Sequence, residues 1–180
     1  MIHDRKIAAH PEIPWGVRRA MPADLEVLLA IQHGSPQAPA WSSPTWQRML
    51  NLDQAGSLSR VCLVAEGKNP TLRSRWVLGF CVACCAGEWS ELESVVTEVS
   101  ARGQGVGRML CREVMDWSRG QGARVMDLEV RASNLTAQAL YRSLGFADQG
   151  ARRRYYQDPI EDAVLMSAEL LTAAATRVLP

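Results

Sequence analysis

The sequence lacks the features that mark membrane-spanning and secreted proteins. Its longest apolar stretch, from Trp76 to Cys85, is about half of the ~20 residues that a membrane-spanning helix needs. The first 16 residues contain no apolar core of the kind found in secretory signal peptides. The five cysteines are an odd number without the spacing of a disulfide framework. We therefore expect a cytoplasmic protein with no membrane partner.

An excess of charge of either sign is also lacking. Twenty Lys and Arg residues oppose 19 Asp and Glu residues, which gives a formal net charge of +1 and argues against direct nucleic-acid binding. Hydrophobic residues make up 47% of the chain and charged residues 22%, as in ordinary globular domains. We expect residues 1–180 to form a single domain, with 1–16 and 171–180 as loosely ordered tails.

Apolar periodicity and turn residues divide the chain into alternating elements. Helices are predicted over 22–33, from Ser43 onward, from Val106 to the "GQG" at 120–122, and over 133–144. Strands are predicted over 60–66, 74–85, 91–99, 123–131, 146–156 and 162–169. The first three strands have the short connections of an antiparallel meander, and the rest follow a strand, loop, helix, strand order.

Two of these helices have specific predicted features. The second begins at "SSP", where Ser43 is a suitable N-cap and Pro44 a suitable first helical residue. The fourth is expected to turn Leu135, Ala139 and Leu140 toward the core.

Three glycines in "RGQGVG" directly precede the third predicted helix. Glycine at Gly103, Gly105 and Gly107 allows sharp turns and close approach to the backbone, and free N–H groups at a helix N-terminus bind anions. The spacing is not the G-x-G-x-x-G of dinucleotide-binding folds, and no Gly-Lys-Ser/Thr of a Walker A loop is present. The pattern favours a phosphate-bearing ligand over a tight turn that binds nothing.

This loop resembles the pyrophosphate loop of the GNAT acyltransferases. The stretches "LEVRASNLTAQALYRSLGF" (128–146), "RRRYY" (152–156) and "EDAVLM" (161–166) further resemble the bacterial ribosomal-protein-alanine N-acetyltransferases, the RimI family. The resemblance is specific from about Glu91 to Tyr156 and loose in the N-terminal half. It implies a mixed α/β (α+β) GNAT fold with a mostly antiparallel central sheet, a splayed parallel pair at its centre and about four flanking helices.

The resemblance also implies two catalytic residues. Glu129 matches the general base of the family, although alternation along its strand also allows a simple ion pair with Arg131. Tyr141 matches the general acid of the family. A phenol is suited to that role, because with a pKa near 10 it stays protonated at pH 7 and can donate to a departing thiolate. The alternative for Tyr141 is a buried tyrosine whose hydroxyl merely finds a partner.

Acetyl-CoA is the co-substrate that the resemblance implies, with no metal. The implied contacts are the pyrophosphate loop, a strand segment that meets the acetyl-pantetheine arm largely through its backbone, and the "ASN" asparagine, which is also a plausible helix N-cap. These residues are Arg102, Gly103, Gln104, Gly105, Val106, Gly107 and Arg108, then Val95, Val96 and Thr97, and finally Asn134.

Two further motifs carry weaker signals. Cys81, Cys84 and Cys85 are better explained as buried residues than as a metal site, because strand alternation would split their thiols between two faces. The "RRRYY" segment occupies a stretch that borders the acceptor groove in the family, against the alternative of a plain solvated strand.

The sequence thus predicts transfer of acetyl from acetyl-CoA to the N-terminal alanine of a ribosomal small-subunit protein, with Glu129 as base and Tyr141 as acid. Two other functions remain open. One is acetylation of a different amine, such as a lysine, an aminoglycoside or a small molecule. The other is a non-catalytic module that binds acyl-CoA as a regulatory ligand. The sequence leaves the oligomeric state open.

Overall fold

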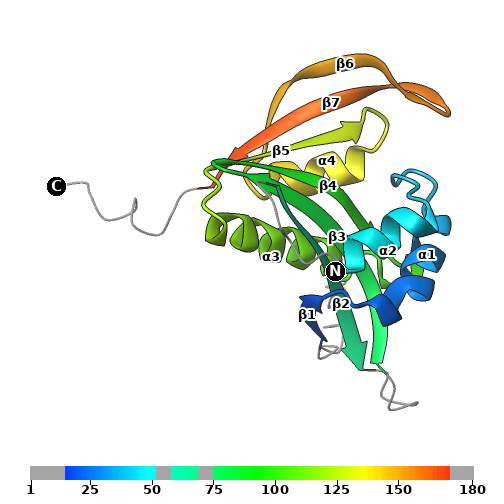
Figure 1. The fold of residues 1–180 in the computed structure, drawn as a ribbon. Coiled ribbons are helices and arrows are strands. Elements are labelled where there is room, and N and C mark those ends of the chain that lie inside the picture. The colour runs from blue at the N-terminus through cyan, green and yellow to red at the C-terminus, as the bar shows by residue number, and fades with distance from the viewer. Residues whose placement is uncertain (1–14, 52–57, 69–74, 171–180) are drawn as a thin grey trace, which may run out of the picture.

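Seven strands form one sheet in the order β1-β2-β3-β4-β5-β7-β6 (Figure 1). This computed structural model describes residues 15–51, 58–68 and 75–170. The strands are β1 (Trp15–Arg19), β2 (Ser59–Lys68), β3 (Arg75–Ala86), β4 (Trp89–Thr97), β5 (Val125–Arg131), β6 (Ala147–Gln157) and β7 (Ile160–Glu169). The helices are α1 (Leu25–His33), α2 (Ser43–Asn51), α3 (Val106–Gly120) and α4 (Leu135–Arg142), with short 3-10 turns η1 (Pro22–Asp24) and η2 (Val99–Ala101).

The expected mixed architecture is confirmed. Strands β1 to β4 form an antiparallel meander, β4 and β5 are parallel, and β7 lies antiparallel between β5 and β6. The expected loose tails at 1–16 and 171–180 lie outside the described residues, except for Trp15 and Gly16, whose backbone begins β1.

Two predicted details of the helices are wrong. The N-cap of α2 is Ser42, one residue before the expected Ser43, because the Ser42 carbonyl accepts from the Trp46 N–H at 3.0 Å and its hydroxyl from the Thr45 N–H at 3.4 Å. Pro44 therefore lies at the second helical position, which proline tolerates because that N–H has no partner within the helix.

The inward face of α4 differs in part from the expectation, because Leu140 packs against the core as expected but the other two residues do not. Leu135 is 69% exposed and Ala139 is exposed, whereas Gln138 and Tyr141 are buried. The reason is a polar anchor, since the Gln138 amide donates to the carbonyl oxygens of Arg131 and Ala132 at 3.1 and 2.9 Å. Apolar periodicity gives no information about such an anchor, which turns the helix so that Leu135 faces solvent.

Helices cover the two faces of the sheet unequally. On one face, α3 and α4 pack over the core through side chains such as Leu110, Val114 and Tyr141. On the other face, α1 and α2 pack through Leu28 and Trp46 onto β2 and β3 and the end of β4. On that second face the helices stop short of β5, β6 and β7, so a large area of sheet stays uncovered (Figure 1).

The cysteines follow the two faces as expected. Cys81 and Cys85 lie in the core beneath α3, and Cys84 lies outside that core near Glu93 and Arg60. All five cysteines are buried and free. Burial raises the pKa of Cys84 to about 12, so this thiol stays protonated.

In the described part of the chain, no helix is long and apolar enough to cross a membrane.

Candidate active site

The glycine loop makes a left-handed entry into α3. Gly103 and Gly105 have φ angles of +74° and +85°, and Gly105 is the N-cap of the helix. Only glycine adopts this conformation without a steric penalty. The first N–H groups of α3, including those of Val106, Gly107 and Arg108, have no acceptor within the helix, and the positive end of the helix dipole adds to them. The predicted residues 102–108 are therefore a loop, up to Gly105, followed by the first turn of α3, and together they have the geometry of an anion site.

The side chains of this loop are held back from that site. The Arg102 guanidinium donates to the Thr97 carbonyl at 3.3 Å and to the Ser35 hydroxyl at 3.2 Å, so it bridges the end of β4 and the segment after α1. The Gln104 amide donates to the Ser100 carbonyl at 2.9 Å. Val106 is buried in the core. The loop thus presents mainly its backbone to an incoming anion.

The parallel pair β4–β5 opens into a wedge. Its pairing is limited to Trp89 with Val125, Ser90 with Met126 and Glu91 with Asp127, after which the strands diverge (Figure 1). The register of β4 against β3 shifts at Glu93, where a bulge begins the divergence. Past the bulge, β4 is paired on its β3 side and β5 on its β7 side. The facing edges therefore offer backbone N–H and C=O groups to a ligand.

The predicted strand segment 95–97 lines this wedge and meets the glycine loop. A Cβ atom placed on Gly107 would lie 3.4 Å from Thr97 Oγ1, 3.9 Å from Val95 Cγ1 and 3.5 Å from Leu140 Cδ2. Val96 points to the other face, into the core beneath α1 and α2. The wedge, the N-terminus of α3 and helix α4 thus converge on one crevice.

Tyr141 follows Leu140 on α4 and is buried in the core on the same face of the sheet as α3. Its side chain is 8% exposed and packs on Phe146 with ring centroids 5.8 Å apart. Among the described residues, no hydrogen-bond partner is found for its hydroxyl. Burial raises the pKa of Tyr141 well above its usual value, and Cys111 contributes to the rise. The phenol is therefore protonated, and within the described part of the chain nothing competes with a ligand for its O–H.

Asn134 is the N-cap of α4, as predicted. Its side-chain oxygen accepts from the Ala137 N–H at 3.1 Å. The cap fixes the start of the helix that carries Tyr141.

Glu129 lies on the opposite face of the sheet from Tyr141. It lies on β5 two residues after Asp127, which is the last residue of β5 that pairs with β4. Its carboxylate pairs with Arg152 of β6 at 2.6 Å, and a hydrogen bond to this carboxylate raises the pKa of Tyr155. The alternative of an ion pair with Arg131 is wrong, because the Arg131 guanidinium is used elsewhere.

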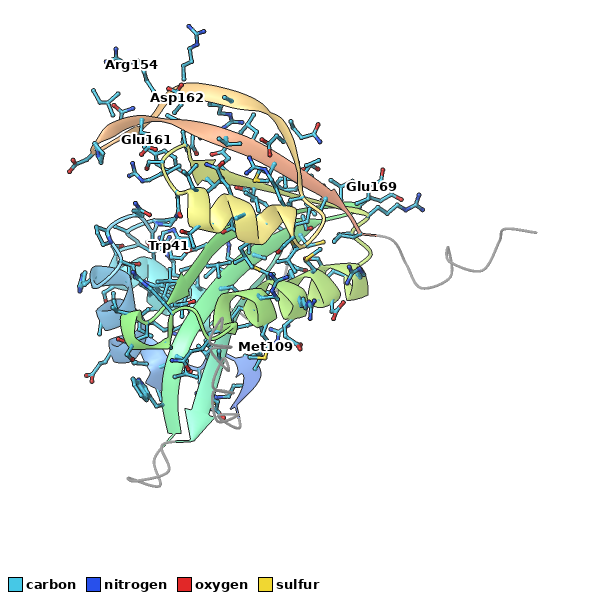
Figure 2. The ribbon with its side chains drawn as sticks, turned by 180° about the vertical axis from the view of Figure 1, so that it is seen from behind. Trp41, Met109, Arg154, Glu161, Asp162 and Glu169 are labelled. Atoms are coloured by element: carbon cyan, nitrogen blue, oxygen red, sulfur yellow. The ribbon has the colours of Figure 1, made fainter. Side chains whose placement is uncertain are left out.

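Arg131 clamps the β6–β7 turn. Its guanidinium donates to the Asp158 carbonyl at 2.9 Å, pairs with Glu161 at 3.2 Å and stacks 4.1 Å from the centre of the Tyr156 ring. Figure 2 shows Glu161 at the turn end of this hairpin and Glu169 at the other end of β7. The buried Arg131 thus fixes the hairpin that carries Arg152 and its neighbours.

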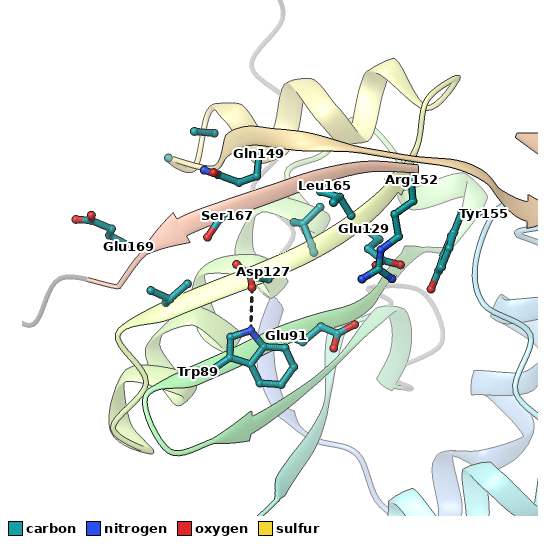
Figure 3. A pocket seen from close by; sticks show the side chains of 14 residues that line it. Trp89, Glu91, Asp127, Glu129, Gln149, Arg152, Tyr155, Leu165, Ser167 and Glu169 are labelled. Carbon is teal, nitrogen blue, oxygen red and sulfur yellow. Dashed lines mark hydrogen bonds and ion pairs between the residues drawn. The ribbon is translucent and has the colours of Figure 1, made fainter. Parts of the chain in front are cut away.

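An open cleft of about 980 Å³ lies on the uncovered face of the sheet and includes Glu129 (Figure 3). Its walls come from β4, β5, β6 and β7 and from Gly145, which precedes β6. Arg152 and Tyr155 reach it from "RRRYY": Arg152 pairs with Ala163 in regular register, and Tyr155 follows a bulge around Arg154, with φ of +53°, that interrupts the β6–β7 register. The sequence did not single out Trp89, Glu91 or Asp127, which line the same cleft, since the alternation of β5 alone could not show which face lacks a helix.

The segment between α1 and α2 is fixed near this face by Gln32. The buried Gln32 amide donates to the Trp41 carbonyl at 3.1 Å, and its oxygen accepts from the Trp41 N–H and from the indole N–H of Trp46 at 3.0 and 2.9 Å. The Trp41 and Trp46 rings pack edge to face at 5.2 Å. This network places the segment beside Arg102, and hence beside the glycine loop.

Known proteins resemble this chain in sequence and in fold. The N-alpha-acetyltransferase RimI of Mycobacterium tuberculosis is 45% identical over 76 residues, which is 42% of this chain and 46% of that protein. The crystal structure of the ribosomal-protein-S18-alanine N-acetyltransferase from Escherichia coli covers 92% of this chain and 99% of its own at 26% identity, with a TM-score of 0.68. Arabidopsis thaliana NAA60 in complex with acetyl-CoA has a TM-score of 0.75 at 21% identity, covers 86% of this chain and 98% of its own, and shares the fold.

The family assignment depends on a longer match. The aligned stretch spans about half the length of the sequence relatives. Residues 29–146, however, match the acetyltransferase (GNAT) family and include the wedge, the glycine loop and α4. The chain therefore belongs to the acetyltransferase (GNAT) family.

Proposed function

We propose that this protein transfers the acetyl group of acetyl-CoA to the N-terminal amine of a protein, and that the acceptor is the terminal alanine of a ribosomal small-subunit protein. Relatives named for this reaction match it in sequence and in fold. One observation carries the proposal. Glu129 lies on one face of the sheet beside the opening between β4 and β5, and Tyr141, for whose hydroxyl the described residues offer no hydrogen-bond partner, is buried on the other face. A base on one side and an acid on the other suit transfer through the opening.

The residues present fit acetyl-CoA. Residues 102–108 would hold its pyrophosphate through backbone N–H groups, because Gly103 and Gly105 leave open space where other residues carry a Cβ. The backbone of 95–97 would bind the pantetheine arm along the edge of the wedge, and Asn134 would border it from the start of α4. When bound, acetyl-CoA supplies the activated acetyl group.

Glu129 would remove the proton from the attacking amine. An α-amine has a pKa near 8 and a lysine amine near 10.4, a difference of about 2.4 units or ~3.3 kcal/mol. A carboxylate at the surface of a cleft therefore suits an N-terminus better than a lysine side chain. The Arg152 side chain that pairs with Glu129 is 57% exposed, so little free energy is lost when this ion pair opens and the acceptor amine takes the place of the guanidinium.

Tyr141 would donate its O–H to the sulfur as the bond to the acetyl group breaks. The amine nitrogen bonds to the acetyl carbon and loses one proton to Glu129, the bond from that carbon to sulfur breaks, and the sulfur gains one proton from Tyr141. The balance closes when Glu129 releases its proton to solvent and the Tyr141 phenolate takes one up. The described residues offer this hydroxyl no other partner, and burial keeps it protonated over the working pH range.

A thiol-release assay tests the proposal. Two peptides are compared, one with a free N-terminal alanine and one with a blocked N-terminus and a single internal lysine. We expect turnover of the free alanine peptide, with kcat lowered about 10²- to 10⁴-fold in Tyr141→Phe and in Glu129→Gln. Acetyl-CoA affinity, measured by calorimetry, should change little in either variant.

The control and the contrary outcomes are distinct. Glu113→Gln removes an exposed carboxylate on α3 and should leave kcat unchanged. Turnover of the lysine peptide alone would contradict the N-terminal acceptor. Tight binding of acetyl-CoA with no turnover of any amine would contradict catalysis and indicate a binding module.

Two further proposals follow from this function. A protein that acts on a ribosomal protein would work in the cytoplasm. We further propose that residues 1–180 act as one transferase domain.

A further inference from the structure

The uncovered face of β5 and its neighbours continues well beyond Glu129. Side chains of alternate residues point into the cleft from β4 (Trp89, Glu91), from β5 (Asp127, Glu129) and from the far end of β7 (Glu169) (Figure 3). Val125 at the start of β5 is paired with Glu169, so the cleft runs four residues back from Glu129. At ~3.3 Å per residue, this is a path of about 13 Å.

Charge along this path is unbalanced. Four carboxylates line the cleft, from Glu91, Asp127, Glu129 and Glu169, against one guanidinium, that of Arg152. Burial raises the pKa of Glu91, and the neighbouring carboxylates of Glu93, Glu129 and Asp127 raise it further. Among the lining residues the field is thus negative, which repels nucleic acid and attracts cationic side chains.

Aromatic rings lie among these carboxylates. Trp89 is 38% exposed, and its indole N–H donates to Asp127 at 2.8 Å, so the ring is fixed with part of its surface open to solvent. Tyr155 is 45% exposed. The guanidinium of Arg152 already combines both kinds of contact, since it pairs with Glu129 and lies 5.5 Å from the centre of the Tyr155 ring. Carboxylates beside open ring faces are the usual surroundings of bound guanidinium and ammonium groups.

We propose that this cleft is a second acceptor subsite, which binds basic side chains of the acceptor polypeptide a few residues after its N-terminus. The proposal rests on the proposed function, because Glu129 sets where the first residue lies. An extended chain that starts at Glu129 and follows β5 would bring its third to fifth residues to Asp127 and Glu169 over the ~13 Å path. Charge complementarity and continuity with the Glu129 site single out this occupant.

Matched peptides and a charge-removing variant test the subsite. One peptide has a free N-terminal alanine and arginine at positions 3, 4 and 5, and the other has glutamine at those positions. In the double variant Asp127→Asn/Glu169→Gln, the asparagine keeps an acceptor for the Trp89 indole. We expect KM for the arginine peptide to rise about 3-fold per charge, or about 10-fold in all, with kcat and the KM of the glutamine peptide unchanged.

Binding is measured separately from turnover, by fluorescence anisotropy of the labelled peptides. The wild-type protein should bind the arginine peptide more tightly than the glutamine peptide, and the difference should shrink as salt is raised. The double variant Glu26→Gln/Glu113→Gln removes two exposed carboxylates outside the cleft and should keep this preference.

The two proposals fail in different ways. Preferential binding of the arginine peptide without acetylation of either peptide would support the subsite and contradict the proposed function. Equal KM and equal affinity for both peptides would overturn the subsite and leave the function intact. Self-association that the Asp127→Asn/Glu169→Gln variant abolishes, without any change in KM, would assign the face to a second copy of the chain and also overturn the proposal.

Discussion

Replacing Gly107 with alanine is expected to separate the stability of the fold from the affinity for acetyl-CoA. Gly107 is the second residue of α3, and its φ is not positive, so alanine meets no backbone strain. The new Cβ would make ordinary contacts with Thr97, Leu140 and Val95 at 3.4 to 3.9 Å. Alanine is favoured over glycine in a helix by up to about 1 kcal/mol. We therefore expect Tm to stay the same or to rise by about 1–4 °C.

The same methyl group would occupy the crevice that we assign to acetyl-CoA. A ligand pushed away from the loop loses at least one hydrogen bond from a backbone N–H to a charged oxygen, worth about 1.5–3 kcal/mol. The expected result is acetyl-CoA binding that is about 10- to 100-fold weaker, measured by calorimetric titration. Thermal unfolding monitored by circular dichroism supplies the Tm.

Gly120→Ala is the matched control for this experiment. Gly120 lies at the other end of α3, and a Cβ there meets nothing within 4 Å. This variant should share the gain in helix propensity and bind acetyl-CoA like the wild type. If Gly107→Ala binds acetyl-CoA as tightly as Gly120→Ala does, the placement of the ligand in this crevice is refuted.

Two further predictions concern the scaffold. Gly79→Ala should lower the free energy of unfolding by about 2 kcal/mol or more in denaturant titration, because the new Cβ would meet the Val96 carbonyl oxygen and lie 3.1 Å from the Thr97 Cα; an unchanged midpoint would contradict the close approach of β3 and β4. Asp24 accepts from Arg18 at 2.8 and 2.9 Å, and this contact lowers the pKa of its carboxyl group. Because the pKa is lower in the folded state, the ionised carboxylate stabilises the fold above about pH 4, and this stabilisation is lost as pH falls. The Tm of Asp24→Asn should therefore lie below that of the wild type by a constant amount from pH 5 to 8, and the difference should shrink below pH 4. A deficit that persists undiminished in acid would contradict that ion pair.

Local sequence signals were sufficient for most of the fold. Every predicted strand and helix is present in the described residues, because each is bounded by turn residues and all but the charged strand β6 have a clear apolar period. The glycine loop could also be predicted from the sequence, since Gly103 and Gly105 adopt the left-handed φ angles that glycine favours. These features depend on neighbours along the chain, which a sequence shows directly.

The features that were missed depend on contacts between distant segments. The face of α4 is set by Gln138, whose amide binds carbonyls of the β5–α4 connection, so Leu135 is exposed despite its apolar side chain. Glu129 pairs with Arg152, 23 positions later, because β7 returns between their two strands and its register with β6 puts Arg152 on the same face of the sheet as Glu129. Neither the Gln138 hydrogen bonds nor the Glu129–Arg152 ion pair produces a periodic sequence pattern, so neither could be recognised before the order of the strands was known.

The narrow junction between β4 and β5 has a consequence for how the molecule opens. Three residue pairs join the two strands, so in the described part of the sheet the meander and the C-terminal strands share few main-chain hydrogen bonds. Acetyl-CoA bound along the unpaired edges of β4 and β5 would form hydrogen bonds with both strands and so connect the meander to the C-terminal strands. We therefore expect amide hydrogen exchange at residues 93–97 to slow when acetyl-CoA is added, and exchange in β2, far from the junction, to change little. In that case the co-substrate completes the sheet on which it reacts.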